Sequence, residues 1–274
     1  MLKIRLSIAA ACLCCGGLFA AEVQVQTKPS ATPASAASPA GTPKPAGSQS
    51  PAASQLPQTR PALLGFGPAS VVNRLDTAKL IADGQKDGSI AFCCSVRPTG
   101  EIANTWTYRG SPDSKLLERE LVRCLDTAVF VPALHKGKPV HVLFYGTVTF
   151  QVQNGKPRLR IFANQEAAEV KKESDFVGPQ PYVGPDSKFE GLHYPADTVT
   201  SELSGIVELA MKIDVEGNLK ELNVVSEYPP LVGFRRAAAE DFRVASFIPA
   251  FRDGKPVECS VTLPVYYEPF DASE

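Results

Sequence analysis

The sequence contains an internal repeat, and this repeat constrains the fold more than any other feature. When residues 88–150 are aligned without a gap on residues 205–267, 13 of the 63 positions are identical. Chance at ordinary composition would give about four identities over such a length. One constant offset also gives every loop the same length in both stretches. We therefore expect one structural unit to occur twice, and we call residues 88–150 copy one and residues 205–267 copy two.

Each copy has the pattern of a strand, a hairpin, a second strand, a helix and a third strand. In copy one, apolar residues alternate over 90–96, and Thr99-Gly100 is typical of a hairpin turn. Apolar residues then recur at helical spacing over 117–128, and alternation returns over 140–148. Copy two repeats these features at the constant offset. The pattern predicts an α+β fold with a three-stranded antiparallel sheet and one packed helix in each copy.

The N-terminal region is different in composition. Lys3 and Arg5 precede an uncharged run over 6–21, which is shorter than the roughly 20 residues that span a bilayer as a helix. We expect residues 1–21 to be an export signal that is cleaved, lipidated at Cys12 or retained as a short anchor. The protein would then be periplasmic, or anchored to the inner membrane and facing the periplasm.

A spacer and a connector complete the predicted organisation. Residues 22–70 are rich in Pro, Ala and Ser and have too few large apolar groups to fold, so they predict a disordered linker. The copy-one domain is expected over 71–155 and the copy-two domain over 187–270. Between them, the connector 156–186 is expected to hold a short helix near 164–172, followed by an irregular Pro- and Gly-rich stretch.

Copy two resembles the TonB C-terminal domain family. The resemblance rests on an ordered set of short features: Tyr194-Pro195, Ser204–Val207, Asp214–Leu219, Phe247–Ala250 and Gly254–Val257. It implies a fold whose first strand lies in the middle of the sheet, with the third strand at an edge. Pro264 supports this position independently, because proline cannot donate to a sheet ladder and is tolerated chiefly on edge strands. Copy one resembles the family more loosely.

The resemblance also implies a function. In TonB, the exposed strand captures an extended peptide of an outer-membrane receptor by strand addition. We therefore expect a non-catalytic protein that binds another envelope protein in this way, with an outer-membrane receptor peptide as one candidate partner. The N-terminal apolar run has no His, unlike the longer membrane helix of TonB energy transducers. The alternative is a structural envelope protein whose repeats pair with each other or with the cell wall.

Strand addition would use residues on the two third strands. The predicted contact residues are Val140, His141, Leu143, Tyr145 and Thr147 in copy one, and Val257, Glu258, Ser260 and Thr262 in copy two. Because Pro264 removes one donor from copy two, and Gly146 allows close backbone approach in copy one, copy one is expected to be the better site. This expectation holds unless the connector or copy two covers that strand.

Four cysteines follow the N-terminal signal: Cys93, Cys94, Cys124 and Cys259. Cys94 and Cys124 fall on apolar faces, so they predict either small hydrophobic side chains in the core or a Cys94–Cys124 disulfide. The spacing does not resemble that of a zinc site, and neither a metal nor another cofactor is expected.

Other function classes find little support. The net charge of −1 argues against nucleic-acid binding, which needs clustered Lys and Arg. The sequence has no nucleophile elbow, no phosphate loop and no recognisable pair of catalytic carboxylates, so an enzyme is not expected. Trp106 and Tyr108 share a face of the second strand, where they either form a contact surface or cover a sheet edge or the neighbouring domain.

Overall fold

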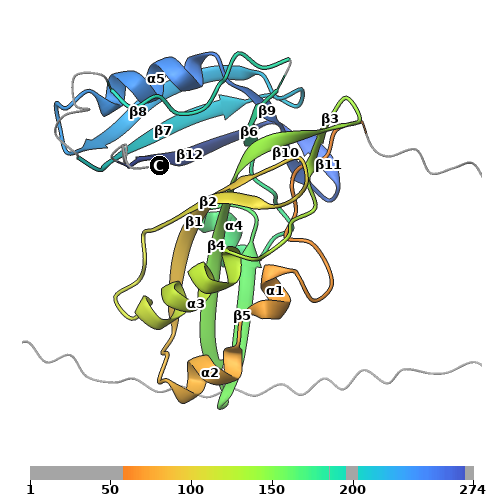
Figure 1. Ribbon diagram of the computed structural model, residues 1–274, viewed down its shortest axis with the longest axis vertical. Helices are drawn as coiled ribbons and strands as arrows, with labels where there is room; N and C mark the ends of the chain where they lie inside the picture. Colours follow the sequence, from red (N-terminus) through yellow and green to blue (C-terminus); the bar gives the residue numbers. More distant parts are fainter. Residues whose placement is uncertain (1–57, 185, 196–202, 269–274) are drawn as a thin grey trace, which may run out of the picture. The chain divides into compact units, whose positions relative to one another are not determined.

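The computed structural model of the chain describes residues 58–184, 186–195 and 203–268. The export signal predicted over 1–21 lies outside the described residues. The elements, in chain order, are α1 (Val71–Arg74), α2 (Thr77–Ala82), β1 (Gly88–Val96), β2 (Ile102–Tyr108), α3 (Lys115–Leu125), β3 (Ala133–His135), β4 (Lys138–Gln153), β5 (Lys156–Phe162), α4 (Ala167–Lys172), β6 (Gln180–Val183), β7 (Gly205–Ile213), β8 (Leu219–Tyr228), α5 (Phe234–Arg243), β9 (Ser246–Ile248), β10 (Ala250–Arg252), β11 (Lys255–Val257) and β12 (Cys259–Tyr267) (Figure 1).

Copy two has the predicted sheet. Its strand order is β12-β7-β8 and both pairings are antiparallel, so the first strand lies in the middle. Helix α5 covers one face (Figure 1), where Phe234, Ala238 and Phe242 are fully buried. Along β7 buried and half-buried residues alternate, as expected for a strand with one face in a core. The mixed α+β class and the antiparallel sheets agree with the prediction.

Copy one also places its first strand, β1, between β2 and β4. The sheet does not end there, however. Strand β5 pairs with the second half of β4, β6 pairs with β4 at His141 and Val142, and β9 of copy two pairs with β6. The expectation of a separate three-stranded sheet in copy one is therefore wrong. The connector adds strands to β4, and one continuous sheet joins the two copies.

The repeat is visible in local geometry. Gly100 and Gly217, at the same position of each hairpin, have φ angles of +88° and +86°. The carbonyl of each accepts the backbone N–H of a phenylalanine that follows the helix, Phe130 at 2.8 Å and Phe247 at 3.0 Å. The hairpin turn expected at Gly100, and at the same position of copy two, is confirmed.

The connector is more ordered than its composition indicates. The short helix expected near 164–172 is present as α4. The stretch expected to be irregular instead contains β6, so this part of the prediction is wrong. Gln180 is only 1% exposed and pairs with Ile248 of β9, and a bridge between Val177 and Phe251 continues this contact. Two neighbouring strands, β4 and β9, supply the hydrogen bonds that the short strand could not satisfy alone.

The end of the predicted spacer also belongs to the fold. Arg60 and Leu63 form bridges with residues that follow α3, and Ala62 is fully buried. The amide of Ala62 donates to Gln180 Oε1 at 2.8 Å, and its carbonyl accepts from Gln180 Nε2 at 3.0 Å. The predicted spacer boundary at residue 70 is therefore wrong, because residues 58–70 form part of the fold.

Two hydrophobic cores lie on opposite faces of β1. Phe92 and Cys94 belong to the core under α3, which also contains Leu121 and Phe144. Cys93 points to the other face and belongs to the core of copy two. The alternating pattern predicted only one buried face for this strand. Both faces are buried because copy two packs against the second face of β1, which the alternating pattern predicted to be exposed to solvent.

An ion pair ties the connector to copy two and makes the stability depend on pH. Arg252 Nη2 lies 2.8 Å from Glu169 Oε1, and Ser174 Oγ donates to the same carboxylate at 2.6 Å. The bond from Arg252, and then that from Ser174, lower the pKa of Glu169 to about 2.

A lowered pKa in the folded state means that the ionised form contributes stability above the ordinary pKa of Glu, near 4.5. This contribution is lost as the pH falls towards 2. We expect Glu169→Gln to reduce the dependence of the free energy of unfolding on pH between about 5 and 2, in urea titrations compared with the unaltered protein. Glu240→Gln, on the exposed side of α5, is the control. An unchanged acid profile in Glu169→Gln would contradict this role.

Candidate functional site

Strand β12 is an edge strand of the copy-two sheet, so its outer side has no partner strand in that sheet. The backbone N–H of Thr262 donates to the side chain of Glu166, so it points away from β7. In an antiparallel pair, every second residue points its N–H and C=O to the same side. Ser260, Pro264 and Tyr266 therefore also direct their backbone groups outward. The position of Pro264 on an edge strand is confirmed, because its missing N–H faces away from the ladder.

The outward amides of β12 differ in their partners. Glu166, which precedes α4, accepts from Thr262 with an Oε1···N distance of 3.1 Å. Among the residues that the structure describes, Ser260 and Tyr266 have no acceptor for their amides. Unpaired edge groups either recruit another strand or have to be protected. On the outer side of β12, the amide of Thr262 is thus occupied, whereas the amides of Ser260 and Tyr266 have no acceptor among the described residues.

The third strand of copy one is covered, which corrects the expectation that it forms an open edge. His141 pairs with Val183 of β6, Thr147 pairs with Phe162 of β5, and Val140 pairs with Ala133 of β3. The other two residues predicted on this strand, Leu143 and Tyr145, point into the protein and do not form a surface for a partner. Tyr145 is 4% exposed and belongs to the core of copy two, against which Leu143 also packs.

The third strand of copy two is divided into β11 and β12. Val257 lies on β11 and pairs with Ala250, so it belongs to a hairpin and not to the open edge. Glu258 lies at the break, where its carboxylate is 3.1 Å from the ammonium group of Lys212. Of the nine predicted contact residues, the structure therefore places Ser260 and Thr262 on the open edge.

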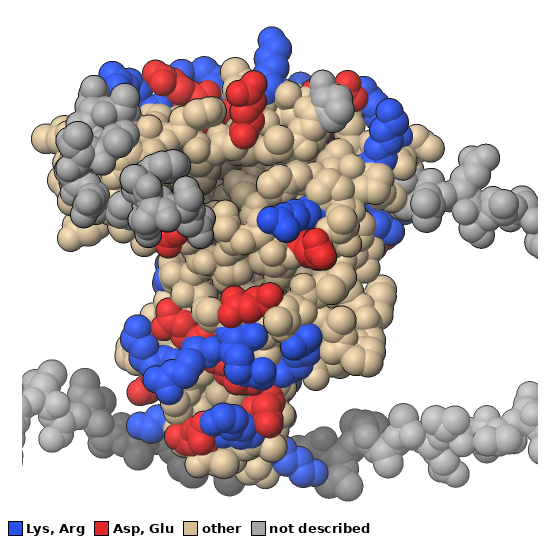
Figure 2. All heavy atoms as spheres, viewed as in Figure 1, with Lys and Arg blue, Asp and Glu red and all other residues tan. Residues whose placement is uncertain are grey.

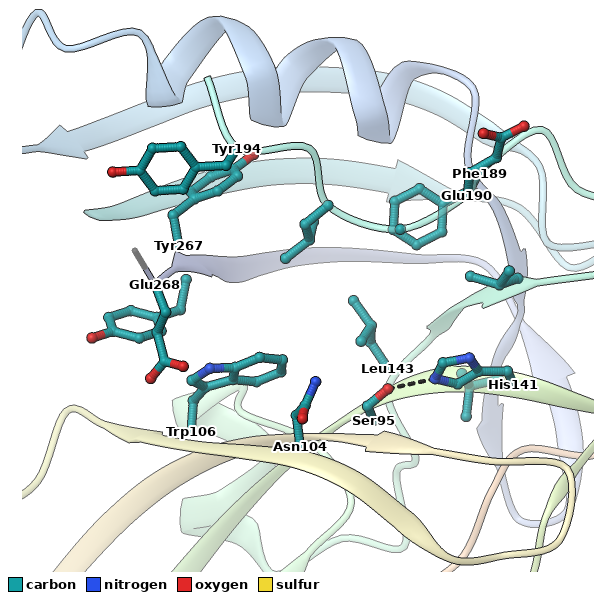
Figure 3. A pocket seen from close by; sticks show the side chains of 15 residues that line it. Ser95, Asn104, Trp106, His141, Leu143, Phe189, Glu190, Tyr194, Tyr267 and Glu268 are labelled. Carbon is teal, nitrogen blue, oxygen red and sulfur yellow. Dashed lines mark hydrogen bonds between the residues drawn. The ribbon is translucent and has the colours of Figure 1, made fainter. Parts of the chain in front are cut away.

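A cleft of about 600 Å³ begins where the free edge of β12 ends. One wall consists of copy-one residues, among them Asn104 and Trp106 on β2 and Leu143 on β4. The opposite wall contains Phe189 and Tyr194 (Figure 3). The last residues of β12 and Glu268 close one end, which places the cleft next to the strand edge. The cleft could not be predicted from the sequence, because residues 189–194 contain no motif that is typical of a binding site.

The aromatic wall of the cleft is held in place by copy two. The Tyr194 ring makes edge contacts with Phe234 at 5.5 Å and Tyr267 at 6.3 Å between ring centroids. Tyr267 in turn stacks on Phe234 at 5.0 Å. On the other side, Trp106 packs against the copy-two core, so it covers the neighbouring domain while one part of it lines the cleft. Both walls are therefore fixed by packing.

Polar groups lie at the two ends of the cleft. Ser95 and His141 are hydrogen-bonded to each other at one end, and Glu268 and Trp106 lie at the other (Figure 3). Burial, and then the charge of Arg97, lower the pKa of His141, so its imidazole is neutral near pH 7. Within the described part of the chain, the lining contains Glu190 and Glu268 and neither Lys nor Arg. On the face shown in Figure 2, Lys and Arg gather elsewhere, over the part of copy one that contains α2 and α3.

The structure contains Cys94 and Cys124 as free thiols, together with Cys93 and Cys259. This agrees with the alternative in which Cys94 and Cys124 are small hydrophobic side chains in the core and form no disulfide. Cys94 and Cys124 are both fully buried. The Cys124 thiol donates to the carbonyl of Arg74 at 3.2 Å, so it is directed at the C-terminal end of α1. Burial raises the pKa of Cys124 to about 11 and that of Cys259 to about 12, which makes both thiols poorly reactive at neutral pH.

We therefore expect all four of these cysteines to be reduced. After denaturation without a reductant, a maleimide should label Cys93, Cys94, Cys124 and Cys259, as read by mass spectrometry of the peptides. In the folded protein at pH 7, the same four should react slowly, because the thiolate is the nucleophile and burial disfavours it. Peptides of Cys94 and Cys124 that stay unlabelled after denaturation, and are labelled once a reductant is added, would establish the disulfide.

Comparison with known families identifies one part of the chain. Residues 190–269 match the family described as Gram-negative bacterial TonB protein C-terminal. This range contains the β12-β7-β8 sheet and α5, and it leaves out copy one. No curated protein matches the chain. No helix among the described residues is long and apolar enough to cross a membrane. With its central first strand, its crossing helix and its open third strand, the segment 190–269 belongs to the TonB C-terminal domain family.

Proposed function

We propose that this protein is an exported, TonB-like envelope protein that binds another envelope protein by strand addition to β12. The observation that carries the proposal is the open outer edge of β12, where Ser260 and Tyr266 have outward amides without acceptors among the described residues. An added strand would gain main-chain hydrogen bonds there. The C-terminal segment belongs to a family of envelope-associated, non-enzymatic domains, which supports a binding role.

Copy one has a supporting role in this proposal. We take it to be a second TonB-C-like domain, because its strands and helix recur at the constant offset and its hairpin turn has the same geometry. Its third strand is closed by the connector, so a partner cannot add to it without displacing β5 or β6. The binding function then falls to copy two, whereas copy one forms one wall of the cleft beside β12.

A structural role is the second candidate. It is favoured by the continuous sheet in which β9 of copy two joins copy one through β6. In this reading the repeats pair with each other, and the protein acts as a rigid envelope component without receptor binding. An outer-membrane receptor peptide is the partner that the family relationship favours under the first proposal, and export to the periplasm is common to both.

Ser260→Pro tests the proposal with little disturbance of the fold. Pro264 already occupies an equivalent outward position on β12, so a proline at 260 should leave the ladder with β7 intact. We expect Ser260→Pro to reduce partner capture at least about tenfold, since it removes a main-chain donor and introduces a bulky ring at the edge. Capture is measured in intact cells by photocrosslinking from a probe at Tyr266, followed by mass spectrometry.

Ser260→Ala is the matched control, because it keeps the backbone donor and should capture the partner normally. Circular dichroism establishes that both variants are folded. A second probe at Thr147, which β5 covers, should give no crosslink. Equal crosslinking yields in the folded proline and alanine variants would reject strand addition at β12 and favour the structural role.

A further inference from the structure

The cleft next to β12 has the chemistry of a site for a cation. As far as the described residues show, its lining combines aromatic rings, including Trp106, Tyr194 and Tyr266, with two carboxylates and no Lys or Arg. Aromatic faces attract ammonium and guanidinium groups, and they do so more strongly when water is partly excluded. A nearby carboxylate that is not already paired adds to this attraction.

The two carboxylates are placed differently. The Glu268 side chain lies at the same end of the cleft as the Trp106 ring, whereas the Glu190 carboxylate points away from the cleft (Figure 3). Both residues are exposed, and neither has an ion-pair partner among the described residues. Elsewhere on copy two, Glu208 pairs with Arg109 and Glu258 pairs with Lys212. Glu268 is therefore the carboxylate best placed to meet an incoming charge.

The cleft is also continuous with the strand edge. Tyr266 directs its unpartnered backbone amide outward and lines the cleft, and Tyr267 and Glu268 follow it directly. A peptide paired with the free part of β12 would place one of its residues beside this end. Side chains alternate along such a peptide, so every second one would face the cleft wall. A long side chain at that position could reach the Trp106 ring.

We propose that this cleft is a subsite for a Lys or Arg side chain of the extended peptide that adds to β12, with Trp106 and Glu268 as its main contacts. This inference rests on the proposed strand addition and specifies the chemistry of the partner. A flexible, apolar stem ending in a charged group suits a cleft with aromatic walls and an acidic end. Glu166, which holds the Thr262 amide, adds a further negative charge along the same edge.

The single tryptophan provides a direct measurement. Because Trp106 is the only Trp in the sequence and lines the cleft, intrinsic fluorescence of the full-length protein reports on its occupancy. The probes are short, acetylated and amidated peptides of alternating Thr and Val, in which a single Arg is moved through the positions. The best binder is then compared with its citrulline analogue, which has the same shape but no charge. Crosslinking from a probe at Ser260 shows separately whether each peptide lies on β12.

We expect the Arg peptide to bind about tenfold more tightly than the citrulline peptide. A partly shielded cation–π contact and one carboxylate can together provide a binding free energy of this size. The advantage should weaken as salt is added. Glu268→Gln should remove most of the difference between the two peptides. Glu190→Gln, at the other end of the cleft, is the matched control and should preserve it.

Three results would overturn the inference in different ways. If both peptides crosslink from Ser260 with equal affinity, the cation subsite is wrong while strand addition stands. If no peptide binds or crosslinks, strand addition at β12 and the subsite both fail. If butylguanidinium alone changes the Trp106 fluorescence at concentrations as low as the Arg peptide does, the cleft is a site for small cations and not for a peptide.

Discussion

Gly217→Ala should destabilise the protein by about 3 kcal/mol, a large part of the stability of an ordinary domain. Gly217 has a φ angle of +86°, which costs an alanine about 1 kcal/mol or more. In addition, a Cβ atom built there would lie 1.9 Å from the carbonyl oxygen of Phe247. That carbonyl belongs to β9, so the clash cannot be relieved by rotating a side chain. The free energy of unfolding in urea measures the effect.

Gly254→Ala is the matched control for this prediction. Gly254 also has a positive φ angle, +70°, but a Cβ atom there would meet nothing within 4 Å. Its substitution should cost only about 1 kcal/mol, because it carries the backbone strain without the clash. Equal destabilisation by the two substitutions would show that the close approach of the hairpin to β9 is unimportant. Gly100→Ala in copy one should resemble Gly217→Ala, since its Cβ would lie 2.2 Å from the carbonyl oxygen of Phe130.

Gln180→Leu is expected to cost about 3 kcal/mol, although leucine fills nearly the same space. The side chain of Gln180 satisfies both backbone groups of Ala62, and both residues are buried. Leucine would leave a buried amide and a buried carbonyl without partners, and each such group costs about 1–3 kcal/mol. The variant should also become sensitive to proteases between residues 58 and 63, because this segment would detach from β6.

The same exchange at an exposed position separates this effect from a general loss of polarity. Gln153, at the exposed end of β4, is the control, and Gln153→Leu should change the free energy of unfolding by less than about 0.5 kcal/mol. Urea denaturation and limited proteolysis measure the two consequences of Gln180→Leu independently. A change below about 1 kcal/mol with unaltered proteolysis would mean that water or another group takes the place of the amide.

Much of each copy could be predicted from local pattern. Alternation over 205–213 and helical spacing over 234–245 follow from one-sided burial, which is visible in a single sequence. The connector was not predictable in this way, because β6 contains Pro181 and lies between Pro- and Gly-rich residues. Its pairing partners, Val142 on one side and Ile248 on the other, are distant in sequence. Strand formation there depends on tertiary contacts and not on propensity.

The candidate site was predictable to a smaller extent. Ser260 and Thr262 could be placed on an open edge because Pro264 excludes a central strand. The cleft could not be predicted, since its walls come from β2, β4 and a segment without regular structure. The closure of β4 was likewise hidden, because nothing in residues 140–148 indicates that β5 and β6 will cover them. Edges are properties of the whole sheet and not of the strand that forms them.

The continuous sheet has a consequence for how the protein is divided experimentally. The family match covers residues 190–269, which would ordinarily set the limits of a fragment for expression. Such a fragment retains β9 but loses β6, the strand with which β9 pairs, and it also loses the partner of Phe251 at Val177. The fragment would therefore expose the backbone of β9 and of Phe251, which are both paired in the intact protein. Fragments cut at the family boundary are expected to associate through these edges, whereas a cut before residue 58 keeps the sheet whole.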